Sequence, residues 1–298
     1  MAKFYMLIGL PACGKTGLSE EFAKKLNNCE VFSSDCIRKE LYGDENIQDN
    51  PGKVFEIMQQ RTILALKNGH DVIYDATNIR RKNRRHLLQS LPSCHKCAVI
   101  VWSKPETCVE RDKGRTRNVG KQVIYRMLRN FQPPYYDEGW DDIQVVHNDS
   151  LYNVMDYCKW VDCEHDNPHH NNTVAEHTHK VCELAVSTEL PKHLEPYGSV
   201  MFISAFLHDI GKKHTKSFIN AKGEKTEIAH YYDHQNVGSY LALGYEDIKS
   251  IKNSTKFLIV WLINNHMEPF FNSKYYKGLK GIEKDLLDFL HHCDKAGA

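Results

Sequence analysis

The sequence predicts an α/β domain with a parallel sheet, followed by an all-α helical domain. The chain has 298 residues, enough for two domains of ordinary size. Its first half alternates short apolar runs with helical stretches, which is typical of a parallel sheet with helices on both faces. From about Leu151 the strand pattern ends and apolar residues recur at helical spacing. We place the domain boundary between residues 152 and 153, giving domains of residues 1–152 and 153–298.

In the first half, each expected strand is a short apolar run and each expected helix shows a 3.6-residue period. The expected strands are Phe4–Ile8, Val31–Phe32, Asp71–Tyr74, Ala98–Trp102 and Ile143–Val146. The expected helices are a stretch ending near Leu26, then Val54–Leu66, Arg84–Leu91 and Gln122–Phe131, the last stopped by Pro133 and Pro134. In the second half the expected helices are Val174–Ser187, Ser199–Leu207, Gln235–Leu243, Ser254–His266 and Ile282–Asp294.

Composition narrows the protein class. Hydrophobic residues make up 41% and charged residues 26%, which excludes intrinsic disorder. No apolar run reaches the roughly 18 residues of a membrane helix, and the N-terminus lacks the cleavage site of a secretory signal. We therefore expect a cytoplasmic protein without a membrane partner, in which the ten cysteines are free thiols. The single C-x-x-C, Cys94 and Cys97, has no second pair at zinc-finger spacing.

Charge divides unevenly between the halves. Residues 1–150 carry 23 Lys and Arg against 19 Asp and Glu, whereas the remainder carries 16 Lys, no Arg and 19 acidic residues. The histidines run the other way, with 4 in the first half and 13 in the second. Arginine suits phosphate contacts and imidazole suits metals, so this division predicts a phosphate-handling domain followed by a metal-binding one.

A phosphate-binding loop occupies the first strand–helix turn. The segment from Gly9 to Thr16, GLPACGKT, matches G-x-x-x-x-G-K-[ST] and stands between an apolar run and a helix. Backbone amides of such a loop surround phosphate oxygens, Lys15 reaches the β- and γ-phosphates, and the Thr16 hydroxyl binds Mg²⁺. We expect ATP or another nucleoside triphosphate, with Mg²⁺, to bind here through Gly9, Ala12, Cys13, Gly14, Lys15 and Thr16.

Polar residues that follow the next two strands predict an acceptor site, because these strands end beside the loop in a doubly wound sheet. Asp35 can take a proton from an attacking hydroxyl, and Arg38, one helical turn later, can hold a phosphate of the acceptor. The alternative is that Asp35 only caps the following helix. Asp75, Thr77 and Asn78 form a second acceptor-side group, in which Thr77 and Asn78 are alternatively helix caps.

Two basic segments follow. Residues 80–85 (RRKNRR) are either a solvated helix face or a surface that attracts a polyanion. Residues 111–117 (RDKGRTR) precede a helix and predict a lid whose arginines neutralise charge on the transferred phosphoryl group. Arg115 is the first candidate for that role and Arg117 the second, and Arg111 is expected to pair within its own helix.

These motifs together resemble the 5′-OH polynucleotide kinase family of P-loop phosphotransferases. The matching segments are GLPACGKT, SSDCIR, YDATN, RDKGRTR, VIYRMLRNFQPP and DEGWDDI. The resemblance implies that Asp35 is the general base, that Arg38 contacts the acceptor phosphate, and that Arg115 contacts the donor. This chain has Gly120 where the family often has proline, which leaves the register of the lid open by a residue or two.

A histidine–aspartate series in the second half predicts a metal site. His208 and Asp209 end an apolar helix, and helical spacing places His177 and Asp294 on inward faces of two others. His234 and His266 complete the series of metal ligands. Each histidine alone is more simply a hydrogen-bonded core residue, but jointly the residues suit one or two ions of Mn, Fe, Co, Ni or Zn.

The second half resembles the HD-domain phosphohydrolase superfamily through EHTHKV, FLHDIGKK, YYDHQNVGS, INNHMEP and LHHCDKAGA. The resemblance implies that His177, His208, Asp209 and Asp294 form the minimal metal set and that His234 and His266 are the extra ligands of larger sites. Lys212 is predicted to contact substrate phosphate, with a surface lysine as the alternative.

The two halves together predict a nucleic-acid end-healing enzyme. It would phosphorylate 5′-OH ends, of RNA in the first place, and remove 3′-phosphates or 2′,3′-cyclic phosphates, so that a ligase can join the products. One alternative is a small-molecule kinase fused to a nucleotide phosphohydrolase. In another, the helical domain is a metal-stabilised sensor that regulates the kinase.

Overall fold

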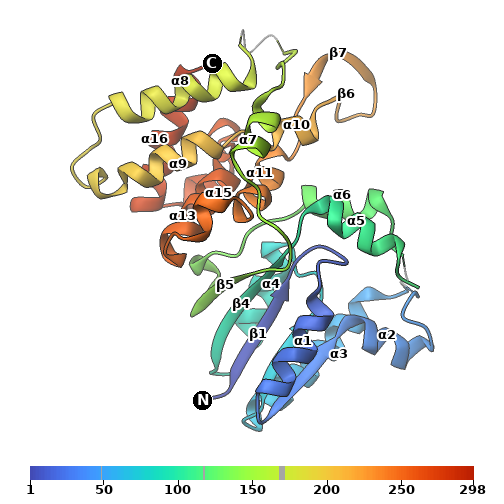
Figure 1. Cartoon of the computed structure of the whole chain (residues 1–298). Coiled ribbons are helices and arrows are strands. Elements are labelled where there is room, and N and C mark those ends of the chain that lie inside the picture. The colour runs from blue at the N-terminus through green and yellow to red at the C-terminus, as the bar shows by residue number, and fades with distance from the viewer. Residues whose placement is uncertain (48, 117, 168–171) are drawn as a thin grey trace. The chain divides into compact units, whose positions relative to one another are not determined.

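The computed structural model describes residues 1–47, 49–116, 118–167 and 172–298 (Figure 1). The chain forms two compact units. Unit 1 comprises Met1–Leu128 and Pro134–Ser150, and unit 2 comprises Arg129–Pro133 and Leu151–Ala298. Within the described residues, no helix combines the length and the hydrophobicity needed to cross a membrane.

Unit 1 is built on a five-stranded parallel sheet in the order β2-β3-β1-β4-β5. Its strands are β1 (Lys3–Ile8), β2 (Cys29–Ser33), β3 (Asp71–Asp75), β4 (His95–Trp102) and β5 (Asp142–His147). Its helices are α1 (Lys15–Lys25), α2 (Ser34–Tyr42), α3 (Pro51–Lys67), α4 (Arg81–Ser90), α5 (Pro105–Lys113), α6 (Lys121–Arg129) and the 3₁₀ helix η1 (Tyr136–Glu138). The predicted parallel sheet is confirmed. The sequence pattern did not predict the bounds of α2 or α5, although helices were expected after Asp35 and around Arg111.

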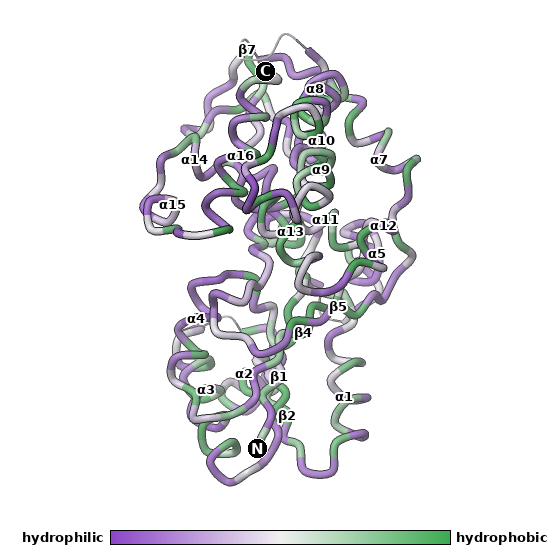
Figure 2. Tube along the Cα trace, turned by 90° about the vertical axis from the view of Figure 1, so that its left-hand side faces the viewer, coloured by the Kyte–Doolittle hydropathy of each residue, from purple (hydrophilic) through white to green (hydrophobic). Residues whose placement is uncertain are grey.

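Helices cover both faces of this sheet. Leu7 and Ile73 point to one face, where Leu18 and Phe22 of α1 pack against them. Figure 2 shows α1 on one side of β1 and β2 and the helices α3 and α4 on the other. Right-handed crossovers produce this division. The chain moves in one direction along the sheet after β1, and in the opposite direction after β2 and after β3.

The register of the sheet brings the predicted site segments together. Leu7 in β1 pairs with Asp75 in β3, and Ser33 in β2 pairs with the same residue. The three strands therefore end level with one another. Because parallel strands present their carboxyl ends at one edge, the segments that begin at Gly9, Ser34 and Ala76 leave the sheet side by side.

Unit 2 is mainly helical. Its helices are α7 (Val154–Val161), α8 (Val174–Ser187), η2 (Glu195–Tyr197), α9 (Gly198–Leu207), α10 (Lys212–Thr215), α11 (His234–Leu243), α12 (Glu246–Lys249), α13 (Asn253–Asn265), α14 (Glu268–Phe271), α15 (Lys274–Gly278) and α16 (Ile282–Ala296). The longer helices α8, α9, α11, α13 and α16 enclose the core, and α13 is buried along nearly its whole length.

The expectation of an all-helical second half is wrong in one place. Strands β6 (Ser217–Ile219) and β7 (Lys225–His230) form an antiparallel hairpin, visible beside α10 in Figure 1. Gly223 closes its turn with a positive φ of 85°, and the Asn220 side chain accepts from the backbone of Lys222 and Glu224. The strands are short and largely exposed, so they lack the apolar alternation by which a half-buried strand is recognised.

Candidate functional sites

The loop between β1 and α1 has the backbone form of an anion-binding nest. Ala12 and Gly14 both have positive φ, 58° and 103°, which turns successive amides toward one side. A Cβ at Gly9 would lie 2.5 Å from the Val101 carbonyl oxygen, and one at Gly14 would lie 2.1 Å from Asn148 Nδ2. Both positions therefore require glycine.

Lys15 directs its ammonium group into this loop. It is nearly buried, and its Nζ donates to the carbonyl oxygens of Gly9, at 3.1 Å, and Leu10, at 2.7 Å. Thr16, the next residue of α1, is exposed. The positive end of α1, the Lys15 ammonium and the loop amides thus converge where phosphates of a nucleotide would bind.

Residues that follow β4 and β5 form hydrogen bonds with the loop. The Cys13 carbonyl oxygen accepts hydrogen bonds from Ser103 Oγ at 3.1 Å and from Asn148 Nδ2 at 3.0 Å. Arg111 donates in turn to Ser103 Oγ and to the Asn148 carbonyl oxygen. The expectation that Arg111 pairs within its own helix is therefore wrong, because its partners follow β4 and β5 and lie 8 and 37 residues away.

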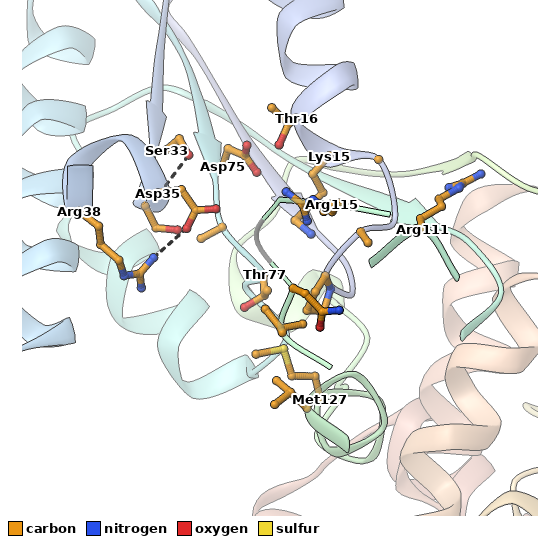
Figure 3. Close-up of a pocket in the computed structure, with 18 of the residues that line it drawn as sticks. Lys15, Thr16, Ser33, Asp35, Arg38, Asp75, Thr77, Arg111, Arg115 and Met127 are labelled. Atoms are coloured by element: carbon orange, nitrogen blue, oxygen red, sulfur yellow. Dashed lines mark hydrogen bonds and ion pairs between the residues drawn. The ribbon is translucent and has the colours of Figure 1, made fainter. Parts of the chain in front are cut away.

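Asp35 and Arg38 lie on one side of α2 and form an ion pair. Arg38 donates through its NH1 to Asp35 Oδ1 at 2.9 Å (Figure 3). The Arg38 side chain is 8% exposed, whereas that of Asp35 is 39% exposed. Ser33, not Asp35, caps the helix, since its hydroxyl accepts from the Asp35 amide. The interpretation of Asp35 as a cap is therefore wrong, and its carboxylate faces the cavity described below.

Asp75 is the last residue of β3 and lines the same cavity as this pair. Burial raises the pKa of the Asp75 carboxyl, the Lys15 and Arg115 cations oppose that effect, and the Asp35 carboxylate adds to it. These interactions place the two carboxylates and two cations of the predicted phosphotransfer site within electrostatic reach of one another. All four side chains line the cavity and are labelled in Figure 3.

Thr77 and Asn78 have different positions. Thr77 lines the cavity, and its carbonyl oxygen accepts from the Gly9 amide at 3.0 Å. Asn78 is not among the residues that line the cavity. Its backbone has a positive φ of 48°, and its side-chain amide donates to the Leu7 carbonyl oxygen at 2.7 Å. Asn78 thus joins the ends of β3 and β1 through its side-chain amide, and its role in acceptor binding stays a prediction.

Most of the predicted residues of unit 1 line one cavity of about 640 Å³. Its polar lining includes Lys15, Thr16, Asp35, Arg38, Asp75 and Arg115. Ala12 and Gly14 also line this cavity. Gly9 and Cys13 are buried residues of the same loop and do not line the cavity. Arg117 lies outside the described residues.

The lid segment is anchored at its base by a residue that the sequence pattern did not single out. The buried carboxylate of Asp112 accepts hydrogen bonds from the backbone amides of Val119 and Gly120, at 2.8 to 3.2 Å. Asp112 therefore closes the loop that carries Arg115 and fixes where α6 begins. Sequence alone could not separate Asp112 from the exposed acidic residues around it.

The basic segment 80–85 is only partly a surface. Arg84 is fully buried, and it donates to both carboxylate oxygens of Glu138, at 2.8 and 2.6 Å, and to the Asn78 carbonyl oxygen. Arg81 lies 3.6 Å from the same carboxylate. Both readings of this run as an exposed surface therefore fail for Arg81 and Arg84. Arg80, Lys82 and Arg85 are exposed.

In unit 2 the predicted metal ligands come together. His177 comes from α8, His208 and Asp209 follow α9, His234 begins α11, His266 follows α13, and Asp294 belongs to α16. All six side chains are buried, at most 9% exposed. The geometry forms two groups of possible metal ligands, His177–His208–Asp209 and Asp209–His234–His266.

Asp209 belongs to both groups through different oxygens. Its Oδ2 lies 3.2 Å from His208 Nε2 and 3.5 Å from His177 Nε2. Its Oδ1 lies 3.3 Å from His234 Nε2 and 3.8 Å from His266 Nε2. Asp294 Oδ1 adds a contact of 3.0 Å to His177 Nε2. A carboxylate shared in this way can bridge two metal ions.

The imidazoles are oriented as metal ligands are. The Nδ1 atoms of His208, His234 and His266 lie 2.7 to 2.8 Å from the carbonyl oxygens of Ala205, Tyr231 and Ile263. His177 Nδ1 is 3.2 Å from the Gly297 carbonyl oxygen. A carbonyl oxygen only accepts, so each Nδ1 donates to it, and in the neutral imidazole this orientation directs the Nε2 lone pair inward. Converging lone pairs beside two carboxylates fit a divalent transition metal.

The electrostatics of the cluster also call for a cation. Burial alone would raise the pKa of Asp209, but His208 and Lys212 hold it well below its usual range. Burial lowers the pKa of His208, yet Asp209 and Asp294 outweigh it and raise that pKa to about 10. Burial, with His234 and His208, lowers the pKa of His266 to about 3. The His208 imidazolium and the Lys212 ammonium thus offset the buried carboxylates here, and a bound metal ion would supply positive charge in place of the His208 proton.

Lys212 and His165 stand at the edge of the cluster. Lys212 is buried, and its Nζ lies 2.7 Å from Asp209 Oδ2 and 3.0 Å from His165 Nε2. The alternative of a surface lysine is therefore wrong. His165 was not predicted. It belongs to the irregular segment before α8, where no periodic pattern marks the inward direction.

Comparison with known proteins finds relatives of unit 1. Residues 4–134 match the protein family described as an AAA domain. This match lies almost entirely in unit 1, whose parallel sheet and phosphate-binding loop have an α/β P-loop kinase fold. The L-seryl-tRNA(Sec) kinase of Methanococcus maripaludis is 29% identical over 165 residues, covering 50% of this chain. The chain spans 62% of the length of that curated relative.

Solved structures that resemble the chain also cover about half of it. The Pnkp1/Rnl/Hen1 RNA repair complex contains a chain 23% identical, with a TM-score of 0.41, covering 47% of this chain and 46% of that one. A fungal RNA kinase is 18% identical, with a TM-score of 0.37 and coverage of 51% and 38%. A gluconokinase from Sinorhizobium meliloti is 17% identical, with a TM-score of 0.35 and coverage of 49% and 82%.

Proposed function

We propose that this chain heals nucleic-acid ends, with RNA as its main substrate. Unit 1 phosphorylates a 5′-hydroxyl with ATP, and unit 2 is an HD-type phosphohydrolase that removes a 3′-phosphate or opens and removes a 2′,3′-cyclic phosphate. The observation that carries the proposal is the pairing, in one chain, of the Asp35–Arg38 pair facing a phosphate-binding loop with two metal-ligand groups that share Asp209. A 5′-phosphate and a 3′-hydroxyl are the ends that a ligase joins.

In unit 1 the acceptor oxygen attacks the γ-phosphorus while the bond to the β-phosphate oxygen breaks. The part-exposed Asp35 carboxylate takes the proton that the hydroxyl loses. Arg38 holds the Asp35 carboxylate through one oxygen, which supports a role of its guanidinium in binding a phosphate of the acceptor. Lys15 and Arg115 offset the charge on the transferred group, and Thr16 and Asp75 would hold Mg²⁺ directly or through water.

In unit 2, His177, His208, Asp209 and Asp294 would hold one metal ion, and Asp209, His234 and His266 a second. Bound metal would polarise the phosphate and provide hydroxide at neutral pH. The protein groups orient this chemistry. Backbone carbonyls fix the imidazoles, and Lys212, held between Asp209 and His165, presents an ammonium to a substrate phosphate.

A second candidate function has support from the curated relative. That protein's name gives L-seryl-tRNA(Sec) as its substrate, so its acceptor is a hydroxyl on an RNA-borne amino acid. The same phosphotransfer geometry serves an aminoacyl, nucleoside or metabolite hydroxyl equally well. In that case unit 2 would hydrolyse a nucleotide. The two candidates differ in the acceptor and agree on Asp35 as the base.

Phosphate transfer from labelled ATP distinguishes them. The acceptors are a 5′-OH RNA, a 5′-OH DNA, nucleosides and seryl-tRNA, each with Mg²⁺. We expect transfer to the RNA end and its loss in Asp35→Ala, while metal-dependent release of phosphate from a 3′-phosphorylated RNA continues. Transfer only to nucleosides or to seryl-tRNA would overturn the end-healing function. Persistent 3′-phosphate and 2′,3′-cyclic phosphate with Mn²⁺, Co²⁺, Ni²⁺ and Zn²⁺ would overturn the role of unit 2.

A further inference from the structure

We infer that Phe55 is a stacking platform for the base of the nucleoside that carries the acceptor hydroxyl. This inference rests on the proposed kinase function and names the chemical class of its acceptor, a 5′-hydroxyl directly attached to a nucleoside. Phe55 lies on α3 and lines the same cavity as Asp35 and Arg38. It was not among the site residues predicted from the sequence.

The helix presents this ring to the cavity while burying its neighbours. Val54 and Met58 of α3 are fully buried in the core of unit 1, whereas Phe55 is 39% exposed. Covering a partly exposed phenyl ring with a flat apolar surface is favourable, because it removes apolar area from water. The exposed part of Phe55 therefore favours a ligand with such a surface.

Phe55 is on the acceptor side of the site. The helices α2 and α3 pack together, and α2 supplies the proposed base Asp35 and its partner Arg38. The donor phosphates are expected at the loop that holds Lys15 and under the lid that carries Arg115. Attacking and leaving oxygens stand on opposite sides of the transferred phosphorus, so groups beside Asp35 meet the acceptor and not the adenine of the donor.

The chemistry of Arg38 and Phe55 discriminates among possible hydroxyl acceptors. Arg38 is suited to an anionic phosphate, and Phe55 is suited to a π-face. A nucleoside within a polynucleotide offers both, because its base stacks while the following phosphodiester meets the cation. A serine hydroxyl or a sugar acid offers no flat ring next to the reacting oxygen. Stacking is tolerant of base identity, so we expect little sequence preference at the 5′ end.

The test compares two 5′-OH RNAs that differ only at the first nucleotide, one with a normal base and one abasic. The measured quantity is kcat/KM for the RNA at saturating ATP, together with KM for ATP. We expect the wild-type protein to favour the base-bearing RNA about tenfold, and Phe55→Ala to lose that preference by slowing only the base-bearing RNA. Phe55→Trp should keep the preference, and Phe55→Leu should lose most of it.

Leu64→Ala is the matched control, since Leu64 is a more exposed apolar residue of the same helix that does not line the cavity. It should behave as wild type. Equal losses on both RNAs in Phe55→Ala, or a raised KM for ATP, would overturn the stacking role while leaving end healing intact. Failure of the wild-type protein to phosphorylate either RNA would instead overturn the proposed function and this inference with it.

Discussion

At the scale of single residues, Asp209 is the side chain on which both metal groups depend. Its Oδ2 faces His177 and His208, and its Oδ1 faces His234 and His266. We predict that Asp209→Asn lowers the affinity for both ions, whereas His266→Asn lowers the content from about two ions per chain to about one. Metal content after dialysis against Mn²⁺ or Zn²⁺, measured by elemental analysis, checks this.

His179→Asn provides the control for these variants. His179 is on α8 like His177, but its side chain points to solvent and pairs with Glu183. It should keep the wild-type metal content. A wild-type content in Asp209→Asn, or the same loss in His179→Asn as in His266→Asn, would contradict the shared two-ion arrangement.

The individual residues differ in how far their role could be predicted. His177 could be found because a helix with a clear apolar face shows which of its histidines points inward. Lys15 and Thr16 could be found because a loop motif fixes their spacing. The contact of Asn78 with the Leu7 carbonyl oxygen could not be predicted, since an amide at a strand end can bind a ligand or a backbone carbonyl and only the fold shows which carbonyl is near. His165 has its partner Lys212 47 residues away and no periodicity to reveal it.

At the scale of elements, the basic helix α4 combines a structural face with an exposed one. Arg84 forms a buried two-point pair with Glu138 of η1, 54 residues later, while Lys82 is exposed. We predict that Arg84→Gln costs about 3–5 kcal/mol, because it leaves the Glu138 carboxylate buried without its partner. Lys82→Gln should change stability by less than about 0.5 kcal/mol.

Urea unfolding measures the free energy of unfolding of both variants, and loss of ATP binding reports the unfolding of unit 1. A small effect of Arg84→Gln, close to that of Lys82→Gln, would show that α4 does not depend on this pair. The sequence showed the positive charges but not their partner. A run of five cations resembles a surface until the position of Glu138 is known, and no local pattern connects the two segments.

The lid is the second element whose function depends on one buried contact. Asp112 holds the amides of Val119 and Gly120, and these bonds set the position of the loop that carries Arg115. We predict that Asp112→Asn lowers kcat/KM for ATP by about 10- to 100-fold, because a displaced lid misplaces its arginine. Steady-state transfer assays with Glu110→Gln, an exposed carboxylate of the same helix, supply the comparison. Equal rates in the two variants would exclude this anchoring role.

Elements were predictable where their apolar period was strong. The five strands of unit 1 and the long helices of unit 2 meet that condition, and the structure contains them within a few residues of the expected bounds. The hairpin β6–β7 does not meet it. Its strands are held by backbone hydrogen bonds and a glycine turn more than by a buried face, so its residues read as a polar loop in the sequence.

At the scale of the whole molecule, the cavity of the proposed phosphotransfer site lies in unit 1 and the two groups of possible metal ligands lie in unit 2, so neither proposed site takes residues from the other unit. This arrangement predicts independent activities. On an RNA with a 5′-OH and a 3′-phosphate, the wild-type protein should yield a 5′-phosphate and a 3′-hydroxyl. Asp35→Ala should yield only the new 3′-hydroxyl, and Asp209→Asn only the new 5′-phosphate, each at the wild-type rate within about twofold.

The double variant Asp35→Ala, Asp209→Asn completes the comparison, and mass spectrometry of the RNA distinguishes all four end states. Sites that share no residue should have additive effects on the two rates, since coupling energies arise from contacts or common partners. If Asp209→Asn slowed 5′-phosphorylation as strongly as Asp35→Ala does, unit 2 would act as a metal-stabilised regulator of the kinase. Unchanged phosphorylation together with lost 3′ processing is the result that end healing by two separate sites requires.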